Sequence, residues 1–186
     1  IIGLDNNRIV DYEKINNIVK KNIYVIEQKL NFTFKEAVLI LENFNPSFIN
    51  LSGYKRLNGS QILKENITYI INTLKSYTNE IDSKKKIIHI FNSSFNLDKK
   101  QIDNLPIGLH GDFYSHELSF VLINNNNYKD IKNIFDNCNL KLKKILLRSF
   151  IEGAYLSDNN KNFENFFHIK INKCDSKMFY FENNSL

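Results

Sequence analysis

The sequence lacks most of the residues and motifs that mark specialised protein classes. Its 186 residues include no tryptophan, two cysteines, two prolines and six glycines. The cysteines, Cys138 and Cys174, stand outside any C-x-x-C or C-x-x-H arrangement, which excludes the common zinc and dithiol motifs and fits a reducing cytoplasm. No apolar run approaches the ~20 residues that cross a bilayer, and the first four residues carry no basic signal-peptide region.

Motifs for catalysis are also missing from the sequence. None of the four histidines has a second ligand residue at metal-binding spacing. Ser93 and Ser94 lack the G-x-S-x-G nucleophile turn, and the sequence contains no G-x-x-x-x-G-K-[ST] phosphate loop. Asp98 and Asp103 lie in loop sequence, and we interpret them as solvated. The residues by themselves therefore predict no enzymatic activity.

The excess of positive charge is small. Lysine and arginine number 25 against 20 aspartates and glutamates, which gives a net charge of +5. Two lysine clusters, one at residues 84–86 and one formed by Lys141, Lys143 and Lys144, lie at the ends of predicted elements and are interpreted as solvated surface. No nucleic-acid partner is therefore predicted. A start without an initiator methionine and an abrupt end indicate a piece of a longer protein.

Hydrophobic periodicity predicts a compact unit in the middle of the chain. We expect a strand over residues 47–57, a helix that Asn66 caps at its N-terminus, and strands over residues 86–97 and 113–123. The apolar stripe of the helix follows the spacing of one buried face. Its members are Ile67, Ile70, Ile71 and Leu74. The predicted order is strand, helix, strand, strand.

The flanking segments alternate between helices and strands as well. A helix is predicted over residues 12–30, and the short, fully apolar run 37–41 is typical of a buried strand. After four consecutive asparagines, which we read as the end of the middle unit, a helix is predicted over 128–138. The remaining predicted elements are a strand over 145–150, a short helix over 152–157 and a hairpin with strands 166–171 and 178–181. The fold class is therefore mixed α and β.

The stretch from Leu105 to Gly111 is the most unusual local feature. Pro106 precedes two glycines, Gly108 and Gly111, and this pattern predicts a tight backbone excursion between strands. The excursion is either a hairpin connector or a protruding loop at an interface, and the residues leave both interpretations open.

Several stretches, in order along the chain, resemble the bacterial cell-division family FtsA. The family has an aromatic-x-x-Asp strand end followed by an Ile-x-Asn-Pro-x-Gly-Leu/Met-x-Gly loop. Residues 95–98 read Phe-Asn-Leu-Asp, and residues 102–111 read Ile-Asp-Asn-Leu-Pro-Ile-Gly-Leu-His-Gly, with Leu105 as one extra residue. Residues 3–11 resemble the family's Gly-x-x-x-Gly-x-Ile-x-Asp entry to a helix with Asn in place of the second glycine, and residues 138–142 resemble its Cys-Gly-Leu-x-Val segment.

The resemblance implies part of an actin-like, ribonuclease-H-like fold. Residues 1–42 and 125–160 would belong to the first actin-like subdomain. Residues 43–124 would form the inserted strand-helix-strand-strand module called SHS2, an order that agrees with the periodicity. Residues 161–186 would begin the second actin-like subdomain.

The resemblance also implies that the protein acts as an adaptor and not as an enzyme. FtsA-like proteins polymerise, bind the tubulin-like FtsZ through the second half of the fold, attach to the inner membrane by a C-terminal amphipathic helix, and recruit later division proteins through the inserted module. The implied location is the cytoplasmic face of the inner membrane at the division site. Within this chain the implied self-contact or partner contact lies in the loop. Its residues are Pro106, Gly108, His110, Gly111 and Asp112.

The site for the family's cofactor, ATP with magnesium, is altered in this sequence. The resemblance aligns the chain with a D-x-G-G-G-T-T-D turn, in which Lys170 takes the place of the first acid. The glycines and threonines of that turn are replaced by Asn172, Lys173, Cys174, Asp175 and Ser176. Side chains there crowd the approach that glycine leaves to phosphate, so we expect little or no nucleotide binding by this chain. The alternative is that Lys170 and Lys173 bind phosphate as point charges.

Three other interpretations remain open on the sequence. The first is an actin homologue of the PilM type, which acts in pilus assembly. The second is a nucleotide-dependent enzyme of the actin and sugar-kinase superfamily, for which we find neither a catalytic aspartate nor intact phosphate loops. The third is a soluble α/β domain without an assignable role.

Overall fold

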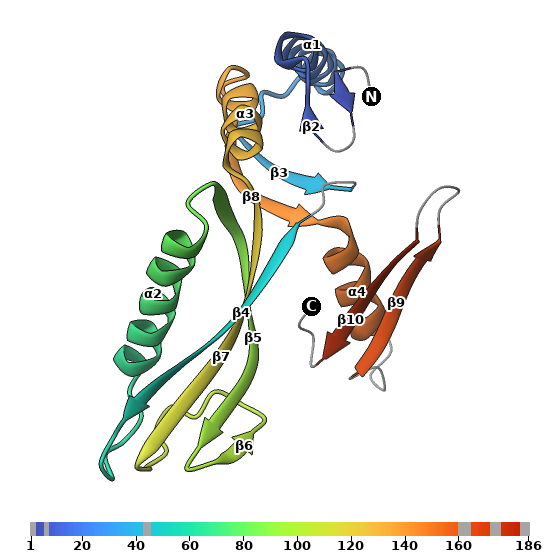
Figure 1. Cartoon of the computed structure of the whole chain (residues 1–186). Coiled ribbons are helices and arrows are strands. Elements are labelled where there is room, and N and C mark those ends of the chain that lie inside the picture. The colour runs from blue at the N-terminus through green and yellow to red at the C-terminus, as the bar shows by residue number, and fades with distance from the viewer. Residues whose placement is uncertain (1–2, 6–7, 43–45, 160–164, 172–175, 183–186) are drawn as a thin grey trace.

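A computed structural model describes residues 3–5, 8–42, 46–159, 165–171 and 176–182. Figure 1 shows three groups of elements: helices and small sheets at the top, a long sheet covered by a helix below, and a helix with a hairpin at the side. No helix of the described residues is long and apolar enough to cross a membrane.

The top group contains a parallel pair of strands. Its elements are β1 (Leu4–Asp5), β2 (Arg8–Ile9), α1 (Tyr12–Leu30), β3 (Glu36–Leu41), α3 (Asn125–Asp136) and β8 (Lys141–Leu147). The prediction of a helix over 12–30 is confirmed, and the Asp11 carboxylate caps it by accepting from the Lys14 N–H at 3.0 Å. β3 and β8 pair in parallel although about a hundred residues separate them.

The four-stranded sheet and its helix form the module in the middle of the chain. Its elements are β4 (Ser47–Arg56), α2 (Lys64–Ile81), β5 (Lys85–Leu97), β6 (Lys100–Ile102) and β7 (Phe113–Asn124). The strands are antiparallel in the order β4-β7-β5-β6. The predicted strand, helix, strand, strand order is present, with β6 as one short additional strand. The assignment of residues 43–124 to SHS2 and the other subdomain boundaries stay predictions.

Both faces of the module's sheet are buried in part. On one face, the apolar stripe of α2 packs on β7. Its buried members are Ile67, Ile70 and Leu74, and those of β7 are Tyr114, Leu118, Phe120 and Leu122. Gly53 lets α2 approach closely, because a Cβ there would lie 2.6 Å from Ile70. On the other face, Phe91, Val121 and Ile123 pack against Leu41, Ile131, Ile145 and Leu147, so the module is joined to the top group by a second core.

The side group consists of α4 (Arg148–Asn159) and the hairpin of β9 (Asn165–Ile171) with β10 (Ser176–Glu182). The hairpin packs on α4 through Phe181, whose side chain is fully buried. A Cβ at Gly153 would lie only 2.0 Å from Phe181 Cζ, so the absence of a side chain at Gly153 makes this contact possible. The predicted hairpin is confirmed in its strands, and its turn lies outside the described residues.

Several predicted details at element ends were wrong. Asn66 is not the N-terminal cap, because α2 begins at Lys64 and the Asn66 Oδ1 accepts from the Leu63 N–H at 2.8 Å inside the first turn. Asn124 caps α3 by accepting from two backbone N–H groups, so the other three asparagines begin that helix instead of ending the module. The strand expected over 145–150 ends at Leu147, where α4 begins directly.

The prediction of a buried strand at 37–41 was wrong for one of the strand's two faces. Val38 is 55% exposed and Ile40 is 52% exposed. Among the described residues, the sheet of β3 and β8 has only two strands. The second core of the molecule covers one face of this sheet. Apolar composition indicates the strand, but which face is covered depends on the elements that pack there.

Candidate functional site

The candidate functional site is a groove of about 760 Å³ between β5 and β8. Among the described residues, β8 pairs only with β3, and β5 pairs on its outer side only through residues 95–97 with β6. On the groove side, these stretches of the two strands therefore pair with no other described strand. The lining includes Ile88, His89 and Phe91 of β5, Leu142 and Ile145 of β8, and Phe150 of α4.

Aromatic rings form the floor of the groove. The ring of Phe150 lies 4.7 Å from that of Phe91 and 5.6 Å from that of His89, measured between centroids. Burial lowers the pKa of His89, although its hydrogen bond to the Ile145 backbone acts in the opposite direction. The imidazole is therefore neutral at pH 7. Its Nε2 is buried and has no hydrogen-bond partner in the described part of the chain.

The rim of the groove is mainly positive. Four lysines and one carboxylate line it, namely Lys132, Lys141, Lys143, Lys144 and Asp136. Lys143 is paired with Glu36 at 2.8 Å, and the other three lysines form none of the ion pairs found among the described residues. A groove with free strand edges, an aromatic floor and a basic rim suits an extended peptide that carries apolar and acidic side chains.

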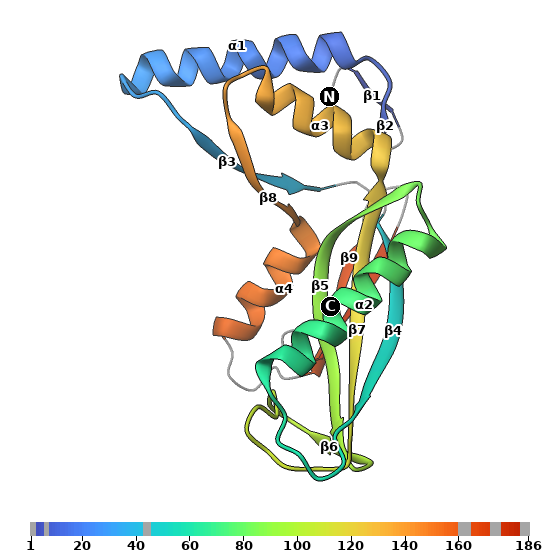
Figure 2. The ribbon, with the colours of Figure 1, turned by 90° about the vertical axis from the view of Figure 1, so that its left-hand side faces the viewer.

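The predicted interaction loop lies at the far end of the module from the top group (Figure 2). Its backbone is paired with residues 59–62: Gly108 N–H donates to Ile62 C=O at 2.9 Å, and Ile62 N–H donates to Leu109 C=O at 2.8 Å. Pro106 is buried, while Leu105, Ile107 and Leu109 are exposed by 41–49%. The loop is therefore a fixed connector with an apolar outer surface, and its role in partner contact stays a prediction.

His110, Gly111 and Asp112 complete the fixed part of the loop. His110 Nδ1 lies 3.2 Å from the Gly59 carbonyl oxygen, and Gly59 N–H donates to Gly111 C=O at 3.1 Å. The Asp112 N–H donates to the Asp98 carboxylate at 2.9 Å. A partner would meet side chains here, because most backbone groups of the loop already have partners.

Of the altered phosphate positions, Lys170 and Ser176 lie in β9 and β10, and residues 172–175 lie outside the described residues. Lys170 Nζ lies 2.6 Å from Glu152 Oε2, and Arg148 Nε donates to Glu152 Oε1 at 2.7 Å. Arg148 also pairs with Glu42 at the end of β3. Burial acts to raise the pKa of Glu152, but the hydrogen bonds from Lys170 and Arg148 outweigh it and lower the pKa.

This ion-pair network was missed by sequence reasoning. The spacing of Arg148 and Glu152, four residues apart on one helix, was the available signal. Nothing local indicates that Lys170, on a different element, points at the same carboxylate. Lys170 is therefore held by α4 in this structure.

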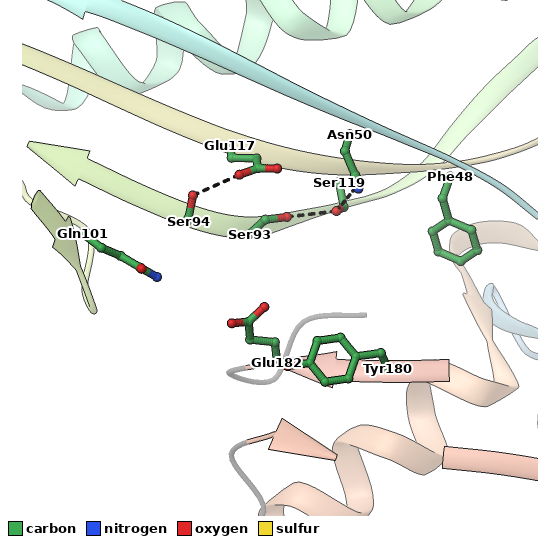
Figure 3. Close-up of a pocket in the computed structure, with 9 residues that line it drawn as sticks. All are labelled: Phe48, Asn50, Ser93, Ser94, Gln101, Glu117, Ser119, Tyr180 and Glu182. Atoms are coloured by element: carbon green, nitrogen blue, oxygen red, sulfur yellow. Dashed lines mark hydrogen bonds between the residues drawn. The ribbon is translucent and has the colours of Figure 1, made fainter. Parts of the chain in front are cut away.

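A second hollow, of about 390 Å³, separates the module's sheet from β10 (Figure 3). Polar side chains on the sheet are hydrogen-bonded to one another there: Ser119 Oγ donates to Asn50 Oδ1 at 2.7 Å, and Ser94 Oγ donates to Glu117 at 3.2 Å. Tyr180 and Glu182 face them across the gap (Figure 3). No group of residues that could hold a metal ion occurs in the described ranges.

Comparisons with known proteins agree with the resemblance seen in the sequence. No family model matches the chain. The cell division protein FtsA of Buchnera aphidicola subsp. Baizongia pistaciae (strain Bp) is 26% identical over 141 residues, which are 76% of this chain and 33% of that protein. A chain in a solved structure of the PilM-PilN type IV pilus biogenesis complex matches with a TM-score of 0.61 at 7% identity, over 99% of this chain and 49% of that one. The chain thus spans a third to a half of the proteins it matches; its sequence is similar to that FtsA, and its fold is part of the actin-like fold.

Proposed function

We propose that the protein is a cell-division adaptor and that this part of it binds a partner's peptide segment in the groove between β5 and β8. The observation that carries the proposal is the pair of free strand edges beside the aromatic floor and basic rim. The likeness to an FtsA sequence supports division over pilus assembly, because the likeness to the PilM-PilN structure is one of fold at 7% identity.

In this proposal the peptide lies along the free edge of β8 and adds a strand to the sheet of β3 and β8. Main-chain hydrogen bonds supply affinity, and alternate side chains reach the floor formed by His89, Phe91 and Phe150. Acidic side chains of the peptide meet Lys141 and Lys144 at the rim. We take the peptide to be the cytoplasmic segment of a later division protein.

The wider role is proposed for the whole protein. The adaptor would polymerise, link the FtsZ ring to the inner membrane and act at the cytoplasmic face of the division site. Contacts to FtsZ and to the membrane would come from regions outside this chain, which covers 33% of its FtsA relative. An assembly role in a pilus machine of the PilM type is the second candidate, favoured by the match to the PilM-PilN fold.

Charge reversal at the groove rim tests the proposal. A labelled peptide in which leucine alternates with glutamate should bind the chain, and Lys144→Glu should weaken binding about fivefold by replacing an attraction with a repulsion. Fluorescence anisotropy measures both. Lys75→Glu on the exposed side of α2 makes the same charge change away from the groove and should have no effect.

Two further kinds of peptide distinguish the candidate functions. Cytoplasmic segments of later division proteins should bind and compete with the leucine-glutamate peptide, and the PilN segment should not. Equal loss of binding in the Lys144 and Lys75 variants would show that the groove is not the site. Binding of the PilN segment alone would replace division with pilus assembly.

We also propose that the protein is not an enzyme and binds magnesium-ATP weakly or not at all. Lys170 stands where a metal-holding acid is expected from the resemblance, and Glu152 holds its ammonium group at 2.6 Å. Calorimetric titration of the full-length protein with magnesium-ATP, beside a homologue with intact glycines, should show no saturable heat.

The Glu152→Gln variant distinguishes the two interpretations of Lys170. If Lys170 served as a phosphate ligand, freeing it from Glu152 would strengthen nucleotide binding. We expect no change. Micromolar affinity in the unaltered protein, lost in Lys170→Ala, would overturn the proposal.

A further inference from the structure

The outer edge of β4 is a long, unpaired strand edge. β4 is the terminal strand of the four-stranded sheet and pairs along its ten residues with β7 on one side. In Figure 2 its other side faces outward at the right of the module, and no described strand pairs with it there. Unpaired N–H and C=O groups at such an edge are a template for another strand.

The edge lacks the features that usually prevent such pairing. Residues 47–54, Ser-Phe-Ile-Asn-Leu-Ser-Gly-Tyr, contain no charged residue and no proline. The first charged residues, Lys55 and Arg56, come at the end of the strand. At the opposite edge of the sheet, β6 covers only three residues of β5. β4 is therefore the strand of this sheet best suited to edge pairing.

We propose that β4 pairs with β4 of a second copy of this chain, antiparallel about a two-fold axis at Leu51. The inference deepens the self-association proposed above and does not involve the groove. In this register Leu51 lies opposite its own copy, and Phe48 lies opposite Tyr54 of the second copy. Phe48 is 44% exposed and Tyr54 is 66% exposed, so pairing covers two large apolar side chains on each copy.

The strand's own sequence favours this register over its neighbours. Ile49, Leu51 and Gly53 face α2, so a slip by one residue would place apolar side chains on the wrong face. A slip by two residues in one direction sets Phe48 opposite Ser52, and in the other direction sets Phe48 opposite Arg56. Only the proposed register joins the two aromatic residues.

The remaining pairs in this register are compatible with it. Asn50 lies opposite Ser52, and because Asn50 already accepts from Ser119 through Oδ1, its amide N–H groups stay free to donate. Lys55 lies opposite Ser47, so no like charges oppose each other. Tyr54 already stacks on Phe113 at 5.4 Å, and Phe48 of the second copy would extend that aromatic row. The edge is thus complementary to itself.

Sedimentation of the whole chain over a wide concentration range tests the proposal. We expect a monomer–dimer equilibrium, weakened at least about tenfold by Ser52→Lys, which places a lysine on the edge. The matched control, Asn72→Lys, adds the same charge on the exposed side of α2 and should leave the equilibrium unchanged. A monomer at every concentration, or equal effects of the two variants, would overturn the proposal.

A disulfide at the two-fold axis tests the register. In a background with Cys138→Ser and Cys174→Ser, Leu51→Cys should cross-link two copies on oxidation, because directly opposed Cβ atoms lie about 5 Å apart. Tyr54→Cys should not, since the two copies of residue 54 would be roughly 20 Å apart. Cross-linking at 54, or failure at 51 in a chain that sediments as a dimer, would reject the proposed pairing. The peptide titration at the groove is unaffected by either result, so failure of the two proposals can be told apart.

Discussion

Replacing Leu74 with alanine is expected to lower the free energy of unfolding by about 2–5 kcal/mol, the range for a buried leucine that leaves a cavity. Leu74 is 7% exposed and packs in the core between α2 and β7. It also lies against Gly53, where an added Cβ would be 3.3 Å from Leu74 Cδ1. Neighbouring backbone can relax little there, because β4 is paired with β7 along its whole length.

Urea unfolding followed by circular dichroism measures this effect. Thr73→Ala changes the adjacent residue on the exposed side of the same helix and should shift the free energy of unfolding by less than about 0.5 kcal/mol. A Leu74→Ala chain as stable as the Thr73→Ala chain would show that the stripe of α2 does not form the core of the module.

Acidification from pH 6.5 to pH 4 is expected to destabilise the fold by about 3 kcal/mol through His116. Its side chain is fully buried, and burial lowers its pKa from 6.5 to about 4. The unfolded chain therefore takes up a proton at higher pH than the folded chain. Stability is complete above pH 6.5, falls as the pH drops, and the loss levels off below about pH 4.

The surroundings of His116 explain why the ring stays neutral. Its Nε2 lies 3.0 Å from Asn92 Oδ1, while its Nδ1 is buried and has no hydrogen-bond partner among the described residues. The ring of Phe95 lies 4.8 Å away. Protonation would add a second donor at Nδ1 with no acceptor, in apolar surroundings.

His116→Leu should remove most of this pH dependence. The free energy of unfolding, measured by urea titration at each pH, should fall less steeply than in the unaltered chain. A smaller slope should remain, because burial also lowers the pKa of His89. Thr73→Ala, on the exposed side of α2, serves as the control and should keep the full slope. An unchanged slope in His116→Leu would mean that the ring is not buried as described.

The sequence alone determined where most helices and strands lie and many of the residues on their inward faces. The stripe of α2 and the alternating residues of β7 follow from periodicities of 3.6 and 2, which the local backbone geometry of helix and strand imposes. The hairpin over β9 and β10 was predictable for the same reason. The family resemblance and the actin-like fold were also available from motifs in their order along the chain.

Only the tertiary structure decided which surfaces meet. It places β8 beside β3, brings Lys170 of β9 to Glu152 of α4, and joins the 105–111 loop to residues 59–62. It also leaves the outer edge of β4 and the groove edges of β5 and β8 unpaired in the described part of the chain. Periodicity is a property of neighbouring residues. Pairing between distant segments depends on the shape, charge and hydrogen-bonding groups of two surfaces together, which no local pattern contains.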